Sequence, residues 1–264
     1  MAVSERVVIS GAGCCTALGH DLDSVARSLR EGRDAFRASG ALEGLSVCPA
    51  EDWGQDEARQ QFEGWRHRHY LNRGSRMAVL SGLRALRDAG LEAGLPVRSQ
   101  IVAAVGPMLD VTGEPGLPPQ DTTTLGALWL PNTAAGALAR FAHCHGEALT
   151  VNAACASALQ ALGEGWRRIR SGLADVVLVA AGDSRLSLGG LLGYHKARAL
   201  SLCAPGAGPR PFDMRRDGFV PGEGGAAFVL ESLSSAQARG AHVHAEVLGY
   251  GASLDAESLT LLRQ

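Results

Sequence analysis

Cys155 is the residue in this chain of 264 amino acids whose type and neighbours are best suited to chemistry. An apolar run of β-forming residues, Ala148 to Val151, leads up to it. After it, Leu159, Leu162 and Trp166 recur at steps of three and four, which is the periodicity of an amphipathic helix. The spacing predicts a strand, a sharp turn and a helix, with Cys155 at the helix start.

A thiol in that position is suited to nucleophilic attack. The unpaired N–H groups and the positive end of a helix dipole favour the thiolate, which attacks carbonyl carbon, and the same N–H groups can stabilise the resulting oxyanion. The alternative is that Cys155 is a small core residue, because cysteine is among the most frequently buried residue types. The small residues of the predicted helix, such as Ala158, Ala161 and Gly163, favour the nucleophile, since they leave room for a substrate arm.

The rest of the chain alternates between predicted strands and helices. Strands are expected at residues 7–11, 101–105, 148–151, 175–183, 226–230 and 243–250, and helices at 21–30, 76–89, 132–141, 155–170 and 234–239. The helix after Cys155 should end near Gly172, which follows three arginines. This alternation, without a fixed repeat, indicates an α/β fold with a largely parallel sheet. No shift in composition suggests a linker, so residues 1–264 are expected to form one domain.

Composition and charge exclude several classes of partner. The hydrophobic fraction is 46%, the charged fraction is 20% and the formal net charge is −2, with both signs mixed along the chain. Such a chain has no electrostatic basis for binding nucleic acid or an anionic membrane surface. It also shows no apolar run of membrane-spanning length and no secretory signal pattern. We therefore expect a cytoplasmic protein with no nucleic-acid or membrane partner.

Two other patterns that could carry a function are weaker. Gly11 to Gly19 follows the first strand, as a dinucleotide-binding loop does, but Thr16 replaces the third glycine of that fingerprint, so we interpret these glycines as turn geometry. The six cysteines are scattered without the spacing of a zinc site, and reduced thiols and no metal are expected.

Eight stretches of the chain together resemble the N-terminal half of the β-ketoacyl-acyl-carrier-protein synthases, condensing enzymes with the thiolase-like fold. They occur in the order and with the spacing of that family from end to end. The stretches are Val7–Gly19, Leu130–Gly136, Val151–Leu159, Gly172–Asp183, Ala197–Ser201, Arg210–Asp213, Asp217–Gly224 and Gly249–Ala256. The resemblance implies a mixed, mostly parallel sheet with helices on both faces and the Cys155 helix buried.

The resemblance also implies roles for individual residues. Cys155 matches the nucleophile that takes an acyl chain from a carrier-protein thioester, and its own N–H matches one oxyanion donor. Leu109 and Tyr194 match side chains that border the acyl pocket, and are candidates for chain-length control. The segment from Asp217 to Gly224 matches a chiefly structural stretch, and Asn132 matches a region near the dimer interface.

This sequence departs from the family pattern in its length. Members of the family continue past the point that matches Gln264, and their second half supplies two histidines, a lysine and a Gly-Phe-Gly-Gly turn. The eight histidines of this chain lie outside those positions. His195 is the nearest, and we retain it as a candidate substitute base, a role that requires hydrogen-bond reach to the substrate.

The function that the resemblance implies is that of an acyltransferase of the 3-oxoacyl-acyl-carrier-protein synthase type. Cys155 would accept an acyl group and condense it, with decarboxylation, with a malonyl thioester in fatty acid or polyketide biosynthesis, once a second half supplies the histidines. The expected partners are acyl carrier protein, which carries the substrate on phosphopantetheine, and a second ketosynthase-like chain in a homodimer or heterodimer. No bound cofactor is expected.

Two alternatives stay open at this stage. The chain could be a ketosynthase-like protein without catalysis, acting as a docking or chain-length subunit of a complete enzyme. The absent histidines favour that interpretation, and the intact Cys155 argues against it. The chain could also be a fragment of an ordinary enzyme, produced by truncation.

Overall fold

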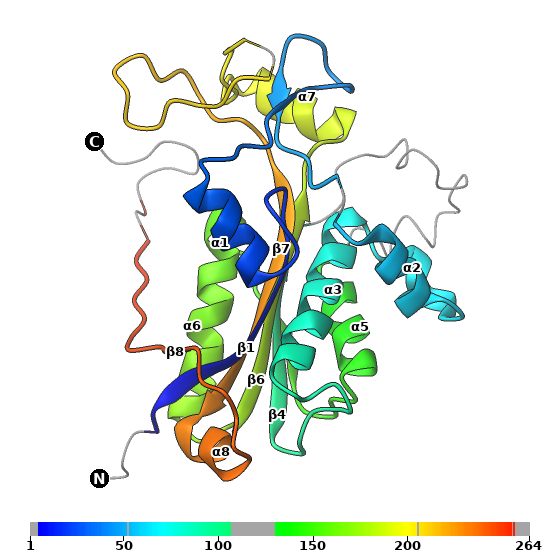
Figure 1. The fold of residues 1–264 in the computed structure, drawn as a ribbon, viewed down its shortest axis with the longest axis vertical. Coiled ribbons are helices and arrows are strands. Elements are labelled where there is room, and N and C mark those ends of the chain that lie inside the picture. The colour runs from blue at the N-terminus through cyan, green and yellow to red at the C-terminus, as the bar shows by residue number, and fades with distance from the viewer. Residues whose placement is uncertain (1–4, 52, 107–129, 205, 255, 257–264) are drawn as a thin grey trace.

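A six-stranded sheet forms the centre of the computed structural model, which describes residues 5–51, 53–106, 130–204, 206–254 and 256 (Figure 1). The strand order is β5-β4-β6-β7-β1-β8. These strands are β1 (Val7–Cys15), β4 (Ser99–Val105), β5 (Ala148–Thr150), β6 (Val176–Ser184), β7 (Glu223–Ser232) and β8 (Ala245–Glu246). Strand β4 is parallel to β5 and β6, whereas β7 is antiparallel to β6 and β1, and β8 is antiparallel to β1. Hence β5, β4, β6 and β1 share one direction.

Helices cover both faces of this sheet, as predicted (Figure 1). The α-helices are α1 (Leu22–Arg30), α2 (Gln55–Phe62), α3 (Arg73–Asp88), α5 (Thr133–Phe141), α6 (Ser157–Arg170), α7 (Leu188–Lys196) and α8 (Leu233–Ala238). Shorter elements are β2 (Arg37–Ala38), β3 (Ser46–Val47) and the 3-10 turns η1 (Arg66–Tyr70) and η2 (Ala154–Ala156). One apolar core lies between the sheet and α3 and α5, and a second lies between the sheet and α6. Within the described residues, none of the helices combines the length and apolar character needed to cross a membrane.

The sheet side of α6 is buried, and the side away from the sheet is open near the N-terminal end of the helix. Ala161 and Ile169 are buried against the sheet, at 0% and 1% exposure. Gly165 lies so close to the strands that a Cβ atom there would be 2.9 Å from Val179 Cγ2. Leu159, on the other side, is 68% exposed. Burial of the Cys155 helix is therefore confirmed for the face toward the sheet.

The interpretation of the glycines of Gly11–Gly19 as turn geometry is wrong for Gly11 and Gly13, because strand β1 continues to Cys15. It is confirmed for Gly19, whose N–H and carbonyl both bond to Thr16 across a tight turn. Gly11 and Gly13 pair with β7, with Gly13 opposite Ala227. A Cβ atom at Gly13 would lie 2.2 Å from the Ser81 carbonyl oxygen of α3. The glycine is therefore explained by the close approach of α3 to the sheet, which a pattern of residue types in one segment does not show.

The last predicted strand, over residues 243–250, is also shorter than expected. Strand β8 comprises Ala245 and Glu246, and the N–H groups of the flanking His244 and Val247 donate to the Ile9 and Val7 carbonyls of β1. From Val247 on, the chain leaves the sheet edge and runs beside α6, where the indole Nε1 of Trp166 donates a hydrogen bond to the Val247 carbonyl at 2.9 Å. The β-forming residues of this stretch are used for a helix contact instead of a sheet ladder.

We predict that Gly13→Ala destabilises the protein by about 2 kcal/mol, because the added methyl group forces α3 away from β1. The measurement is the urea midpoint of unfolding. Gly136→Ala is the matched control, since Gly136 lies in α5 with open space around it, and alanine there should stabilise by about 0.5–1 kcal/mol. Equal midpoints for Gly13→Ala and the wild type would contradict the close contact.

Candidate active site around Cys155

Cys155 lies in the turn that joins β5 to α6, and its side chain is exposed. The turn is closed by its own residues. Ala153 donates its N–H to Ser157 Oγ at 2.7 Å, and the same hydroxyl donates to the Ala154 carbonyl at 2.7 Å. Ala156 donates to the Ala153 carbonyl at 3.1 Å. These bonds hold the thiol at the start of α6, where the sequence predicted it.

The backbone immediately before the nucleophile is in an unusual conformation. Ala154 has a φ of +49°, in the left-handed region that residues with a Cβ atom rarely adopt. Such a conformation persists only where surrounding contacts determine it, and it is frequent at functional sites. Here the Ser157 hydroxyl supplies that contact from the first turn of α6.

The N–H of Cys155 is available to a ligand. Within the described part of the chain, this N–H makes no hydrogen bond. It lies beside the N-terminus of α6, whose dipole places positive potential there. An exposed thiol next to an unused N–H donor can attack a carbonyl carbon and bind the oxyanion that forms.

The far end of α6 is fixed by an ion-pair cluster centred on Arg168. Its guanidinium pairs with Glu147 at 2.7 Å and with Glu164 at 2.9 Å, and donates to Gln100 Oε1 at 2.6 Å. Hydrogen bonding to Glu147 raises the pKa of Arg168, and the same contact lowers the pKa of the Glu147 carboxyl group. The cluster ties the end of α6 to β4 and to the residue before β5. Composition and spacing gave no signal for it.

Four of the other five cysteines differ from Cys155 in their environment. Burial raises the pKa of Cys14 to about 11, and burial is also the main cause of the raised pKa of Cys15 and Cys144. Cys48 is half-buried and its pKa is raised for the same reason. These thiols are protonated near neutral pH and are buried or half-buried, whereas Cys155 is exposed.

Of the two residues expected to border an acyl pocket, the structure places one. Tyr194 lies on α7, and its ring packs edge-on against Phe219, with centroids 5.2 Å apart. Leu109 lies outside the described residues. His195, the candidate substitute base, is exposed in the last turn of α7.

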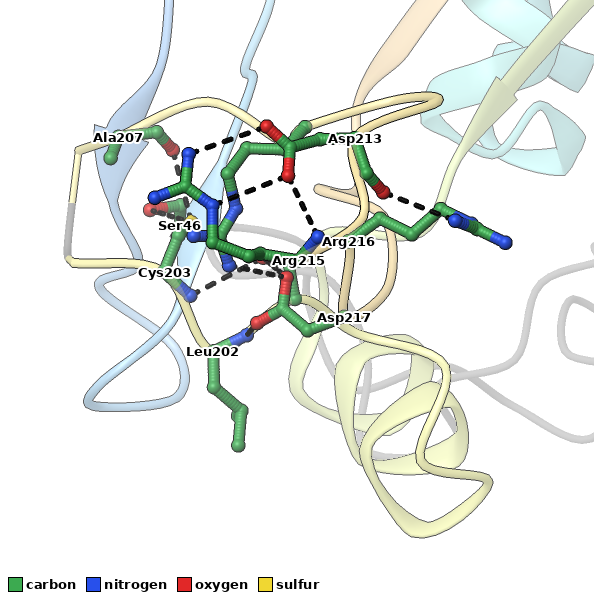
Figure 2. A network of polar contacts seen from close by, with 10 residues as sticks. Ser46, Leu202, Cys203, Ala207, Asp213, Arg215, Arg216 and Asp217 are labelled. Atoms are coloured by element: carbon green, nitrogen blue, oxygen red, sulfur yellow. Dashed lines mark hydrogen bonds and ion pairs between the residues drawn. The ribbon is translucent and has the colours of Figure 1, made fainter.

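Phe219 is held by its own backbone, since its N–H donates to the Ala199 carbonyl at 3.0 Å and its carbonyl accepts from the Ser201 N–H at 2.9 Å. Asp217, two residues earlier, joins the same two loops (Figure 2). Asp217 Oδ1 accepts a hydrogen bond from Ser201 Oγ at 2.7 Å, and Oδ2 accepts from the Leu202 N–H at 2.9 Å. The hydrogen bond from Ser201 is the main cause of the lowered pKa of Asp217, which also pairs with Arg210 at 3.3 Å. The carboxylate therefore fixes the loop beside the Tyr194 ring.

A second group of contacts orders the loop before Asp217. Figure 2 shows Asp213 facing Arg215 and Arg216: the Arg215 N–H donates to Asp213 Oδ1 at 2.7 Å, and Arg216 donates to the Asp213 carbonyl. Cys203 Sγ contacts the Ala207 carbonyl at 3.3 Å and Ser46 Oγ at 3.7 Å. The loop around α7 is thus built on polar contacts.

Across the described ranges, no group of three or more possible metal-ligating side chains occurs.

The mixed sheet, the two covering layers of helices and the thiol at a strand–turn–helix junction define an α/β protein of the thiolase-like fold. A family model described as the N-terminal domain of beta-ketoacyl synthase matches residues 4–236. The chain therefore belongs to the beta-ketoacyl synthase family. The family and fold predicted from the eight stretches are confirmed.

Individual relatives agree with this assignment. A putative mitochondrial 3-oxoacyl-[acyl-carrier-protein] synthase of Schizosaccharomyces pombe is 30% identical, over 97% of this chain and 65% of its own length. The ketoacyl synthase alpha subunit of the tetracenomycin polyketide synthase of Streptomyces glaucescens is 31% identical, over 98% of this chain and 65% of its own length. The crystal structure of a beta-ketoacyl synthase from Burkholderia phymatum matches with a TM-score of 0.80 and 29% identity, over 97% of this chain and 66% of that chain. The chain thus spans slightly less than two thirds of the length of these relatives.

We predict that iodoacetamide at about pH 8 labels Cys155 well before the buried cysteines, because only exposed, ionisable thiols react. Cys14 and Cys15, at 7% and 0% exposure, should react only after unfolding in urea. The measurement is the modified fraction of each cysteine peptide by mass spectrometry over time. Labelling of Cys14 at the rate of Cys155 in the folded protein would contradict the environments described above.

Proposed function

We propose that this chain carries the nucleophile of a β-ketoacyl-acyl-carrier-protein synthase. The observation that supports the proposal most is the exposed Cys155 thiol beside its own unused N–H, at the start of α6. This arrangement has the two groups that acyl transfer requires, a nucleophile and an oxyanion donor.

In the first step, Cys155 Sγ forms a bond to the carbonyl carbon of an acyl thioester. The carbonyl oxygen becomes an oxyanion, and the Cys155 N–H donates a hydrogen bond to it. The tetrahedral intermediate collapses with cleavage of the bond to the departing sulfur, which leaves as the phosphopantetheine thiol with the proton that Cys155 has lost. The acyl group is then held on Cys155 as a thioester.

The second step in the proposed activity is a condensation. A malonyl thioester loses carbon dioxide, and the resulting enolate carbon attacks the carbonyl carbon of the Cys155 thioester and releases the thiolate. We assign this step to the complete enzyme, since the resemblance implies that the family's histidines for decarboxylation lie in a second half, and this chain covers 65% of the length of these relatives. Tyr194, and Leu109 by resemblance, would border the acyl chain.

The proposed partners follow from the same assignment. The substrate-bearing group would be phosphopantetheine on an acyl carrier protein, with no cofactor bound to the chain itself. A similar structure, 27% identical with a TM-score of 0.77, is described as the ishigamide ketosynthase/chain length factor, which supports pairing with a second ketosynthase-like chain or a second copy. All six cysteines are free thiols, as suits the cytoplasm. Residues 1–264 would form the nucleophile-bearing domain.

We predict that mixing the protein with an acyl-carrier-protein thioester gives an acyl adduct on the Cys155 peptide. Intact-protein and peptide mass spectrometry would detect it. Cys155→Ala should abolish the adduct, whereas Cys203→Ala, which removes another free and partly exposed thiol, should retain it. A stable complex with the carrier protein but no adduct would instead support a docking or chain-length subunit without catalysis.

A further inference from the structure

The chain beyond β8 crosses the outer side of α6. Residues Val247–Tyr250, which we name the strap, run beside this helix (Figure 1). At its start the strap is fixed to the sheet edge, because the Val247 N–H donates to the Val7 carbonyl of β1 at 2.9 Å. The Val247 carbonyl accepts from Trp166 Nε1 of α6 at 2.9 Å. Val247 therefore links the sheet edge to α6, because its N–H bonds to β1 and its carbonyl bonds to α6.

A further contact of the strap is made by the Tyr250 ring, which lies directly on Gly163 of α6. A Cβ atom added at Gly163 would be 2.4 Å from ring carbons of Tyr250, so the ring occupies the space that any side chain would need. The guanidinium carbon of Arg167 lies 4.9 Å from the centre of the same ring, in cation–π range. Tyr250 is thus held between a glycine and an arginine one helical turn apart.

The opposite side of α6 is confined at the same level. Gly165 faces the sheet, where a Cβ atom would lie 3.0 Å from Leu230 Cδ1 and 2.9 Å from Val179 Cγ2. Two residues along an α-helix differ by about 200° around the axis, so Gly163 and Gly165 point to opposite sides. At this level α6 is therefore held in a grip between the sheet and Tyr250, with a glycine at each of the two close contacts.

Between this grip and Cys155, the outer side of α6 is open, because Ala158 and Leu159 are exposed. Gly163 is eight residues after Cys155, which corresponds to about 12 Å along the helix. A shift of α6 at Gly163 would move its N-terminal turn as well. A displacement of about 1 Å at a reacting atom can lower a rate about a hundredfold.

We propose that Tyr250 is a positioning residue for the Cys155 nucleophile, acting through the grip on Gly163. This inference depends on the proposed function of Cys155. A purely stabilising strap would make the same contacts, but its removal would lower the melting temperature without changing the chemistry of the thiol below that temperature.

The test compares Tyr250→Ala and Tyr250→Phe with the wild type, at a temperature well below all melting transitions. The first readout is single-turnover acyl transfer from an acyl-carrier-protein thioester to Cys155. Tyr250→Ala should lower the limiting rate about tenfold or more, with the half-saturating thioester concentration unchanged. Tyr250→Phe should retain the wild-type rate, because the ring on Gly163 remains.

The second readout, which does not depend on activity, is amide hydrogen exchange in the peptide that contains residues 155–162. Exchange there should be faster in Tyr250→Ala than in the wild type or in Tyr250→Phe, since the N-terminal half of α6 loses its outer support. Gly163→Ala is a second variant: it favours helix formation but displaces the ring, and should reproduce the Tyr250→Ala result.

The two readouts separate the possible failures. If the wild type is acylated and Tyr250→Ala keeps both its rate and its exchange, the positioning role is wrong and the proposed function stands. If exchange changes but the limiting rate does not, the strap supports α6 without positioning the nucleophile, and the inference is again wrong. If the wild type forms no adduct while exchange responds as expected, the proposed function fails and the hold of the strap on α6 stands.

Discussion

The close approach of α6 to the sheet is the constraint on which the site depends. Gly165 allows the helix backbone to lie against Val179 and Leu230, and Ala161 and Ile169 continue the same contact along the helix. A core of this kind transmits displacement, because packed interiors have few voids into which a side chain can move. The position of the thiol at the start of α6 is therefore determined by packing along the whole helix.

Charged contacts complete this arrangement at the ends of the elements. Glu223, whose side chain is 1% exposed, accepts hydrogen bonds from Arg73 of α3, from Ser184 at the end of β6 and from the Ala50 N–H. A buried carboxylate needs such partners, since an unpaired charge in the interior is costly. Glu223 thereby joins α3, β6 and β7. Arg168 links the C-terminal end of α6 to Glu147, the residue before β5.

The sequence predicted the elements whose signals are local. The apolar run of β6, the strand and turn before Cys155, and the end of α6 at Gly172, with its φ of +73°, are all readable from neighbouring residues. The sequence could not show the contacts between segments that lie far apart along the chain. The glycines of β1 resemble a turn until α3 is packed against them, and the β-forming residues near Tyr250 resemble a strand until α6 is beside them. The same limit explains why Cys155 could be recognised and the grip on Gly163 could not.

Ala154 shows how local backbone and site chemistry are connected. Its left-handed conformation turns the chain sharply between β5 and α6, and a glycine would adopt it at lower cost. A glycine would also be freer to leave it. With alanine, the methyl group restricts the alternatives in the unfolded and partly opened states, while the Ser157 hydroxyl bonded to the Ala154 carbonyl supports the strained state. The Ser157 hydroxyl, which also accepts from the Ala153 N–H, therefore holds the turn before Cys155 in one conformation.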